Sequence, residues 1–245
     1  MNPTIDLINK HRSIRKFTDQ PIPQHTLQQL ITAGQAAATS SFVQSVSVIQ
    51  VTNSATRSAL AEVAGGQQYV ETCAEFLVIC ADMKRNEQLA VKHGATPKTG
   101  FTEHFLIAAI DAGLFAQNLV TAAESLDLGV CYIGALRNNP QRVSELLQLP
   151  DLVCPLFGLC LGYPAQNPEV KPRMPMSMVL HQDQYNTQID EQTLQDYDAT
   201  VQHYYTTRTG NNKSQGWSEQ MATFFGKESR PHMLAWLNSR GFVNN

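Results

Sequence analysis

The sequence feature that most constrains the fold is a long apolar stretch at about residues 103–126. Its spacing predicts one helix that is apolar nearly all round, and such a helix is buried among other elements. Asp111, Gln117 and Asn118 interrupt the stretch, so its uncharged part is too short to cross a bilayer. We therefore expect a central helix of a water-soluble protein and no membrane span.

Two other apolar runs predict strands that pack beside this helix. AEFLVICAD (74–82) and CPLFGLCLGYP (154–164) are continuous rather than alternating, as in strands covered on both faces. A shorter strand is predicted at residues 46–52, and a short strand followed by a turn at residues 131–137. Helices are predicted at residues 3–10, 25–38, 54–64 with Ser54 as the cap, 140–147 and 190–207, and in most of 217–242. Residues 84–100 are polar without a clear period, so we expect a surface excursion or lid.

The length of 245 residues favours one large domain with an extension. We expect a core at residues 1–180 and a C-terminal helical extension at residues 181–245. The extension has fewer long apolar runs, and such a segment tends to pack over something else, often a second subunit.

The net charge and the cysteine content limit which partners and which cellular compartment are expected. The net charge of −3 argues against a general nucleic-acid binder, which is usually basic. The five cysteines form no C-x-x-C pair, and an odd number suits a reducing compartment. The N-terminus lacks the apolar core of a signal peptide. We therefore expect a cytoplasmic protein.

Several familiar catalytic motifs are absent from the sequence. It contains no G-x-G, no Walker lysine, no H-E-x-x-H and no G-x-S-x-G. The seven histidines are scattered, so we expect no metal site. No side chain stands out as a catalytic group, and this pattern indicates that a cofactor performs the difficult chemical step.

Three separate clusters suggest which cofactor that is. Residues 11–15 (HRSIR) and 171–173 (KPR) concentrate cations, whose donors suit phosphate oxygens. In residues 131–135 (CYIGA), Gly134 lets a flat group approach the backbone. Residues 39–42 and 65–67 add small hydroxyls, one aromatic face and one amide. This set of groups fits flavin mononucleotide (FMN). From spacing alone, the cations could equally be surface charges, the aromatic residues part of the core, and the small polar residues helix caps or turns.

A series of segments, in order, resembles the FMN-dependent nitroreductase superfamily. The likeness covers nearly the whole chain and is specific for the NADPH-linked branch, which holds oxygen-insensitive nitroreductases and NADPH–flavin oxidoreductases. The segments are HRSIRKFT, SSF, GGQ, AEFLVICAD, AQNLVTAAESLDLG, YIGALRNN, LFGLCLGYPAQNPEVKPRMP, YYTTRTGNN and ESRPHML.

This resemblance implies an α+β, three-layer nitroreductase fold with a central, mainly antiparallel sheet flanked by helices. It also implies an intertwined homodimer with FMN at the subunit interface and NADPH as co-substrate. The positions that match FMN contacts are His11, Arg12, Ser13, Ile14, Arg15, Thr39, Ser40, Ser41, Gln67, Tyr132, Ile133, Gly134, Ala135, Lys171, Pro172 and Arg173. Arg208 and Lys213 match the NADPH site, and Ser41, Phe42 and Arg230 match the substrate site.

The implied reaction is a two-electron ping-pong cycle that reduces nitroaromatics, quinones or related acceptors. One alternative is an NADPH-dependent flavin reductase that supplies free reduced FMN. Another is a non-catalytic flavin-binding protein, against which Arg208 argues. The chain departs from the usual pattern at Thr39, Ala135 and Lys213, where serine, glycine and arginine are more common among members of the branch.

Overall fold

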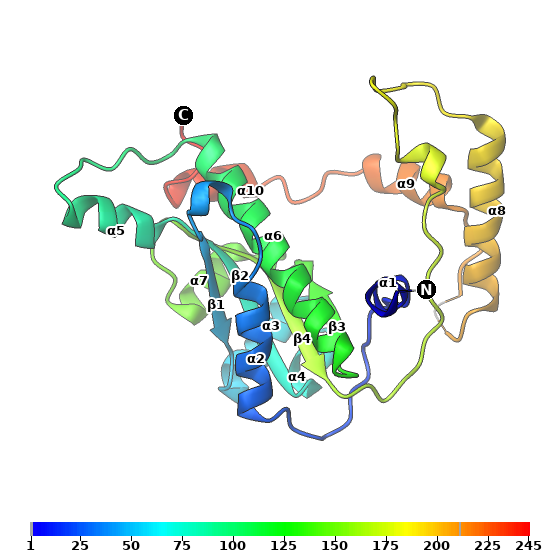
Figure 1. The fold of residues 1–245 in the computed structure, drawn as a ribbon, viewed down its shortest axis with the longest axis horizontal. Coiled ribbons are helices and arrows are strands. Elements are labelled where there is room, and N and C mark those ends of the chain that lie inside the picture. The colour runs from blue at the N-terminus through cyan, green and yellow to red at the C-terminus, as the bar shows by residue number, and fades with distance from the viewer. Residues whose placement is uncertain (1, 211) are drawn as a thin grey trace. The chain divides into compact units, whose positions relative to one another are not determined.

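The computed structural model describes residues 2–210 and 212–245 (Figure 1). These residues form two compact units. The larger contains the chain up to Gln166 together with Arg230–Asn245, and the smaller contains Asn167–Ser229. The larger unit is built on a sheet with the strand order β1-β2-β4-β3, in which all neighbouring strands are antiparallel. The strands are β1 (Val46–Gln50), β2 (Glu75–Asp82), β3 (Gly129–Ile133) and β4 (Val153–Gly162).

Alternate residues of the sheet face two different helical layers, because successive side chains of a strand point to opposite faces. Leu77 and Ile79 of β2 belong to the core beneath α2 (Gln24–Gln35) and α6 (Thr102–Ser125). Phe76 and Val78 belong to the core on the other face. That face is covered by α3 (Ser54–Val63), α4 (Tyr69–Thr72) and α7 (Pro140–Leu147). The predicted three-layer α+β fold with its antiparallel sheet is confirmed.

Helix α6 is the predicted long helix, and it packs closely on α2. A Cβ atom on Gly34 of α2 would lie 2.7 Å from the ring of Phe115, so only glycine allows this approach. The opposite face of α6 is uncovered in this chain, because Leu106, Ile110 and Leu114 are 48%, 59% and 45% exposed. Length and composition alone would let α6 cross a membrane, but its other face is packed in the core.

Two local predictions are wrong. Residues 84–92 form helix α5 (Lys84–Lys92), where no helix was expected. The carboxylate of Asp82 accepts hydrogen bonds from the amides of Lys84 and Arg85, so the end of β2 caps the helix. Helix α3 is capped by Asn53, whose side chain accepts a hydrogen bond from the Thr56 amide, and not by Ser54.

The remaining helices lie near the two ends of the chain. Helix α1 (Pro3–Asn9) and helix α10 (Met233–Ser239) belong to the larger unit. The smaller unit contains α8 (Glu191–Thr207) and α9 (Trp217–Phe225). Its core is small and aromatic, with Tyr197, Val201 and Tyr205 buried against Trp217.

Candidate functional site

The cationic segment at residues 11–15 lies along the outer edge of β3. Ser13 forms a parallel bridge with Val130, and the Ile14 amide donates to the Val130 carbonyl at 2.8 Å. Gly129 makes this possible, because a Cβ atom there would lie 2.7 Å from Cγ1 of Ile14. The buried Ile14 side chain therefore fixes the neighbouring polar residues against the sheet.

The polar residues of this segment contact groups from three other elements. Nδ1 of His11 lies 2.7 Å from the Glu124 carboxylate near the end of α6. Arg12 donates to the Lys10 carbonyl at 3.0 Å. Arg15 interacts with the phenol of Tyr69: burial and Cys131 raise the pKa of Tyr69, and Arg15 opposes that rise.

Residues 132–135 continue from β3 into the short 3₁₀ helix η2 (Gly134–Asn138). Tyr132 is partly exposed and its ring packs edge-on against Phe157, with ring centres 5.3 Å apart. Burial, with a smaller contribution from Glu124, raises the pKa of Tyr132 to about 12. The Tyr132 phenol is therefore neutral at physiological pH. Ile133 is buried, and Gly134 and Ala135 are partly exposed.

The loop at residues 39–42 is attached to a different part of α6. The Ser40 amide donates to Oδ1 of Asp111 at 3.1 Å, whereas Tyr132 contacts Gln117. Six residues of helix separate Asp111 from Gln117, or about 9 Å along its axis. Within a single chain, the loop at residues 39–42 and the side chain of Tyr132 therefore contact α6 at two different positions along its length. Phe42 is 80% exposed at the tip of the loop.

In the smaller unit, three cations surround one buried aromatic ring. Lys171 Nζ, Arg208 Cζ and Lys213 Nζ lie 5.3, 4.4 and 5.7 Å from the centre of the Tyr205 ring. Burial on its own would raise the pKa of Tyr205, but the three cations together lower it. The structure thus brings the predicted FMN ligand Lys171 together with the predicted NADPH ligands Arg208 and Lys213.

The residues next to Lys171 complete this cationic group. Arg173 donates to the Lys171 carbonyl at 2.6 Å, across the intervening Pro172. Both cations act on the buried Tyr197, whose pKa is raised by burial while Lys171 and Arg173 oppose the rise. The ring of Tyr205 and the carbonyl of Lys171 therefore hold four cations in one small region.

Arg230 contacts the turn that follows β3. Its Nε donates to the Asn138 side chain at 3.0 Å, and its charge acts on the neighbouring Arg137. Burial first, and Arg230 second, lower the pKa of Arg137. Arg230 also adopts a left-handed backbone conformation, with φ of 52°.

Comparison with known proteins decides the family. Residues 8–163 match the nitroreductase family, and residues 171–245 match the nitroreductase family C-terminal domain. The chain is 49% identical to the NADPH-flavin oxidoreductase of Vibrio harveyi, over 99% of both chains. It is 44% identical to the oxygen-insensitive NADPH nitroreductase of Salmonella typhimurium, again over 99% of both.

The chain belongs to the nitroreductase family. Its fold agrees closely with solved structures of this family. The crystal structure of nitroreductase A from Vibrio parahaemolyticus superposes with a TM-score of 0.93 at 47% identity. The NADPH:FMN oxidoreductase of Vibrio harveyi complexed with NAD+ superposes with a TM-score of 0.92 at 46% identity. Both comparisons cover 100% of each chain. The predicted resemblance to the NADPH-linked branch is confirmed.

The polar groups of this nitroreductase fit a flavin phosphate and its hydroxylated chain. Oε1 of Gln67 and Oγ1 of Thr39 are buried and have no hydrogen-bond partner within residues 2–210 and 212–245. Buried polar atoms are normally hydrogen-bonded, so these two atoms are free to bond the polar groups of a bound molecule. Arg12 and Arg15 add the positive charge that a phosphate requires. The described part of the chain shows no cluster of three or more potential metal ligands.

Sequence patterns did not single out several residues that the structure places beside the predicted ones. Glu124 contacts His11, Tyr69 contacts Arg15, and Tyr205 lies beneath the cations of the smaller unit. Asp111 was noted only as an interruption of the apolar helix. A lone carboxylate within an apolar helix is itself a signal, because a buried charge needs partners.

Proposed function

We propose that this nitroreductase is an FMN-dependent NADPH oxidoreductase that reduces nitroaromatics, quinones or related small acceptors by two electrons. The observation that carries the proposal is the attachment of the HRSIR segment to β3. This attachment places two arginines and two smaller polar residues on the same strand edge as Tyr132. The names of the full-length relatives, an NADPH-flavin oxidoreductase and an NADPH nitroreductase, support the same activity.

The residues proposed to hold FMN divide by chemistry. Arginine and lysine side chains at residues 12, 15, 171 and 173 would neutralise the phosphate. The hydroxyls at residues 13, 39, 40 and 41, with the Gln67 amide, would bond the ribityl chain and ring edge. Residues 132–135 would support the ring through their backbone. Held by these residues, FMN would supply the two-electron redox chemistry that links NADPH to the acceptor.

For NADPH, Arg208 and Lys213 are proposed to bind the 2′-phosphate. For the acceptor, Ser41, Phe42 and Arg230 are proposed as contacts, with the exposed Phe42 ring offering a flat apolar face. No side chain is assigned as an obligate acid or base, since water can supply the protons. The surrounding arginine and lysine side chains would stabilise the negative charge that develops during reduction.

A dedicated flavin reductase remains the alternative. One relative, 42% identical over the whole of both chains, is the FMN reductase (NADPH) of Bacillus subtilis. The two activities use the same first step and differ in the acceptor. Steady-state rates with nitrofurazone and with free FMN as the acceptor would separate them.

We further propose an intertwined homodimer in the cytoplasm, with no nucleic-acid or membrane partner. The exposed stripe of Leu106, Ile110 and Leu114 on α6 supports a subunit contact, because a second chain would cover it. Residues 1–180 would form the FMN-binding core, and residues 181–245 would pack on this core and on the partner. The five cysteines are free and buried, which suits a reducing compartment.

The test is the absorbance spectrum of the purified protein, before and after anaerobic addition of NADPH. Bound flavin gives bands near ~370 and ~450 nm, and NADPH should bleach the second band. Acceptors can then be ranked by the rate at which they restore the colour. A protein that stays colourless after incubation with FMN would overturn the proposal, and a flavin band that NADPH cannot bleach would overturn its NADPH part.

A further inference from the structure

The loop that carries the predicted acceptor residues has an unfavourable backbone conformation. Ser41, Phe42 and Gln44 adopt left-handed conformations, with φ of 46°, 57° and 54°. Residues other than glycine rarely occupy this region, and they persist there only when surrounding contacts enforce it. The loop therefore requires external attachments that keep Ser41 and Phe42 in place.

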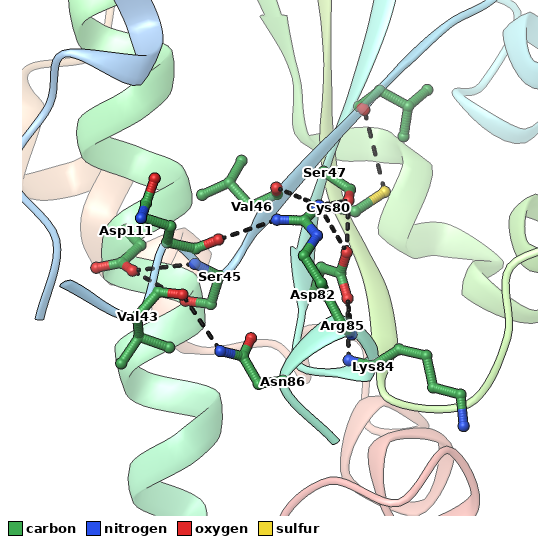
Figure 2. Close-up of polar contacts among 12 residues, drawn as sticks. Val43, Ser45, Val46, Ser47, Cys80, Asp82, Lys84, Arg85, Asn86 and Asp111 are labelled. Carbon is green, nitrogen blue, oxygen red and sulfur yellow. Dashed lines mark hydrogen bonds and ion pairs between the residues drawn. The ribbon is translucent and has the colours of Figure 1, made fainter. Parts of the chain in front are cut away.

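The first attachment is a buried carboxylate in the middle of α6. Asp111 is 0% exposed, and its Oδ1 accepts from the Ser40 amide at 3.1 Å. Its Oδ2 accepts from the amide and the hydroxyl of Ser45, at 3.3 and 2.9 Å, and Ser45 is itself fully buried. The three hydrogen bonds therefore hold Ser40, which precedes the left-handed residues, and Ser45, which follows them. Figure 2 shows the contact between Asp111 and Ser45.

The second attachment comes from the first turn of α5. The Arg85 guanidinium donates to the carbonyls of Gln44 and Val46, each at 3.3 Å, and to the Ser47 hydroxyl at 2.9 Å. The Asn86 amide donates to the Val43 carbonyl at 3.3 Å. Figure 2 shows these donors reaching the loop from the opposite side to Asp111. Together, the two attachments provide hydrogen-bond partners for the amides of Ser40 and Ser45. They do the same for the carbonyls of Val43 and Gln44.

Asp111 contributes nothing to the apolar packing of its helix. Its neighbours in the core face are Ala108, Ala112 and Phe115, and an apolar residue would pack there without the cost of burying a carboxylate. Among residues 2–210 and 212–245, the hydrogen bonds that offset this cost come from Ser40 and Ser45. The presence of a carboxylate at this position is therefore explained by the loop and not by the helix.

We propose that Asp111 is the positioning residue of the acceptor site: by holding Ser40 and Ser45, it fixes Ser41 and Phe42 in their left-handed conformations. The inference rests on the proposed function, in which Ser41 and Phe42 contact the acceptor. The acceptor is a small molecule with few anchors, so it depends on a preorganised loop. NADPH is also anchored through its 2′-phosphate and depends less on the loop.

The test compares Asp111→Asn with two other variants. Asparagine keeps the volume, but its NH₂ group replaces one acceptor oxygen and faces a donor from either Ser40 or Ser45. Ser45→Ala removes one of the three bonds and keeps the carboxylate. Glu103→Gln, in the exposed first turn of the same helix, removes the same charge without touching the loop and is the matched control.

In Asp111→Asn, we expect KM for nitrofurazone to rise about tenfold, with KM for NADPH changed by less than about threefold. FMN content should fall only slightly, because Ser40 and Ser41 are two of many proposed FMN contacts. Ser45→Ala should show a smaller shift in the same direction, and Glu103→Gln none. Hydrogen exchange at the amides of residues 40–45 should be faster in Asp111→Asn than in the control by about tenfold or more. This exchange measurement needs no turnover, so it tests the attachment even if the proposed activity is wrong.

Two results would overturn the inference. One is a folded Asp111→Asn enzyme whose nitrofurazone KM and loop exchange both match those of Glu103→Gln. The other is an equal loss of FMN content and of activity with every substrate, which would mark Asp111 as a purely structural residue. If Asp111→Asn does not fold, Ser45→Ala decides by the same two readouts. A wild-type protein that NADPH cannot reduce would instead refute the proposed function.

Discussion

The two cationic regions of this chain are held in place by different kinds of contact. In the larger unit, residues 11–18 are joined to the sheet by main-chain bonds, including Ile14 to Val130 and Thr18 to Tyr163. In the smaller unit, the cations are gathered on the Tyr205 ring. Main-chain bonds fix a position whatever the charge nearby, whereas cation–π contacts are weaker and compete with any bound anion. The first arrangement holds its segment rigidly against the sheet. The second lets the cations proposed for FMN (Lys171) and for NADPH (Arg208 and Lys213) adjust to a bound anion.

The largest effect should come from Gly129→Ala, which tests the rigid region. The added Cβ would lie 2.7–2.9 Å from three atoms of Ile14 and push residues 11–15 off the β3 edge. An extra methyl group in a packed site costs about 1–3 kcal/mol. A loss of that size taken from FMN binding is roughly tenfold or more in affinity. The flavin-to-protein absorbance ratio after gel filtration measures it.

Ile14→Ala in the Gly129→Ala background is the compensating control. It removes the Cγ1 and Cγ2 contacts at 2.7 and 2.9 Å but keeps the Cβ contact at 2.8 Å, so only part of the FMN content should return. If Gly129→Ala retains the full FMN content, the β3 attachment does not position the phosphate ligands.

Arg208→Ala should give an effect of similar size, and it acts on the adjustable region. A hydrogen bond to a charged group is worth about 1.5–3 kcal/mol, so KM for NADPH should rise by roughly ten- to a hundredfold. FMN content should change little, and KM for NADH should also change little, because NADH lacks the 2′-phosphate. Unchanged NADPH kinetics would remove Arg208 from the site.

Tyr205→Leu should weaken NADPH binding more modestly. The ring positions the cations and does not itself contact the nucleotide, so only part of the about 0.5–1 kcal/mol per cation–π contact would be lost from binding. KM for NADPH should therefore rise by less than roughly tenfold, while KM for NADH is nearly unaffected. Tyr205→Phe keeps the ring and is the matched control, with an effect confined to the lost phenol. Steady-state kinetics with both nucleotides measure this. Equal loss with NADPH and NADH would show that Tyr205 serves folding and not selectivity.

The smallest effect concerns the pH dependence of stability at Tyr132. Burial raises the pKa of this phenol to about 12, above the ordinary value near 10, so the folded state holds the proton more tightly. Stability from this group is complete below pH ~10 and is lost as pH rises towards ~12. Because Tyr132 is partly exposed, the loss by pH ~11 should stay below about 1 kcal/mol. Urea unfolding at pH 8 and 11 should show a larger loss of stability in wild type than in Tyr132→Phe, since the other buried phenols and thiols contribute equally to both proteins.

The sequence predicted those parts of the fold that rest on long apolar patterns. The predicted bounds of helix α6 and of the buried strands β2 and β4 agree with the structure to within a residue or two. These elements could be predicted because continuous apolar residues mark them in the sequence. Helix α5 was not predicted, because its stability depends on tertiary contacts. Its first turn is capped by the Asp82 side chain, and Arg85 bonds it to β1. Contacts of this kind leave no periodic pattern in the sequence.

For the candidate site, the polar clusters were predicted but their connections were not. The pairing of His11 with Glu124, separated by 113 residues, depends on how α6 crosses the sheet. The association of Lys171 with Tyr205 likewise arises from the folding of the smaller unit. The assignments of individual residues to FMN, NADPH or the acceptor remain predictions, and the variants above test them.

The burial of every native thiol has a practical consequence for spectroscopy. All five cysteines are free and buried, and burial raises the pKa of Cys154 to about 12 and that of Cys80 further. Cys73, whose pKa is lowered by a hydrogen bond with Cys160, is only 3% exposed. Alkylating reagents attack exposed thiolates, so the native protein should resist them. A cysteine introduced by Phe42→Cys would then react selectively, and a fluorescent or spin label there would report on the motion of the acceptor loop without removal of any native cysteine.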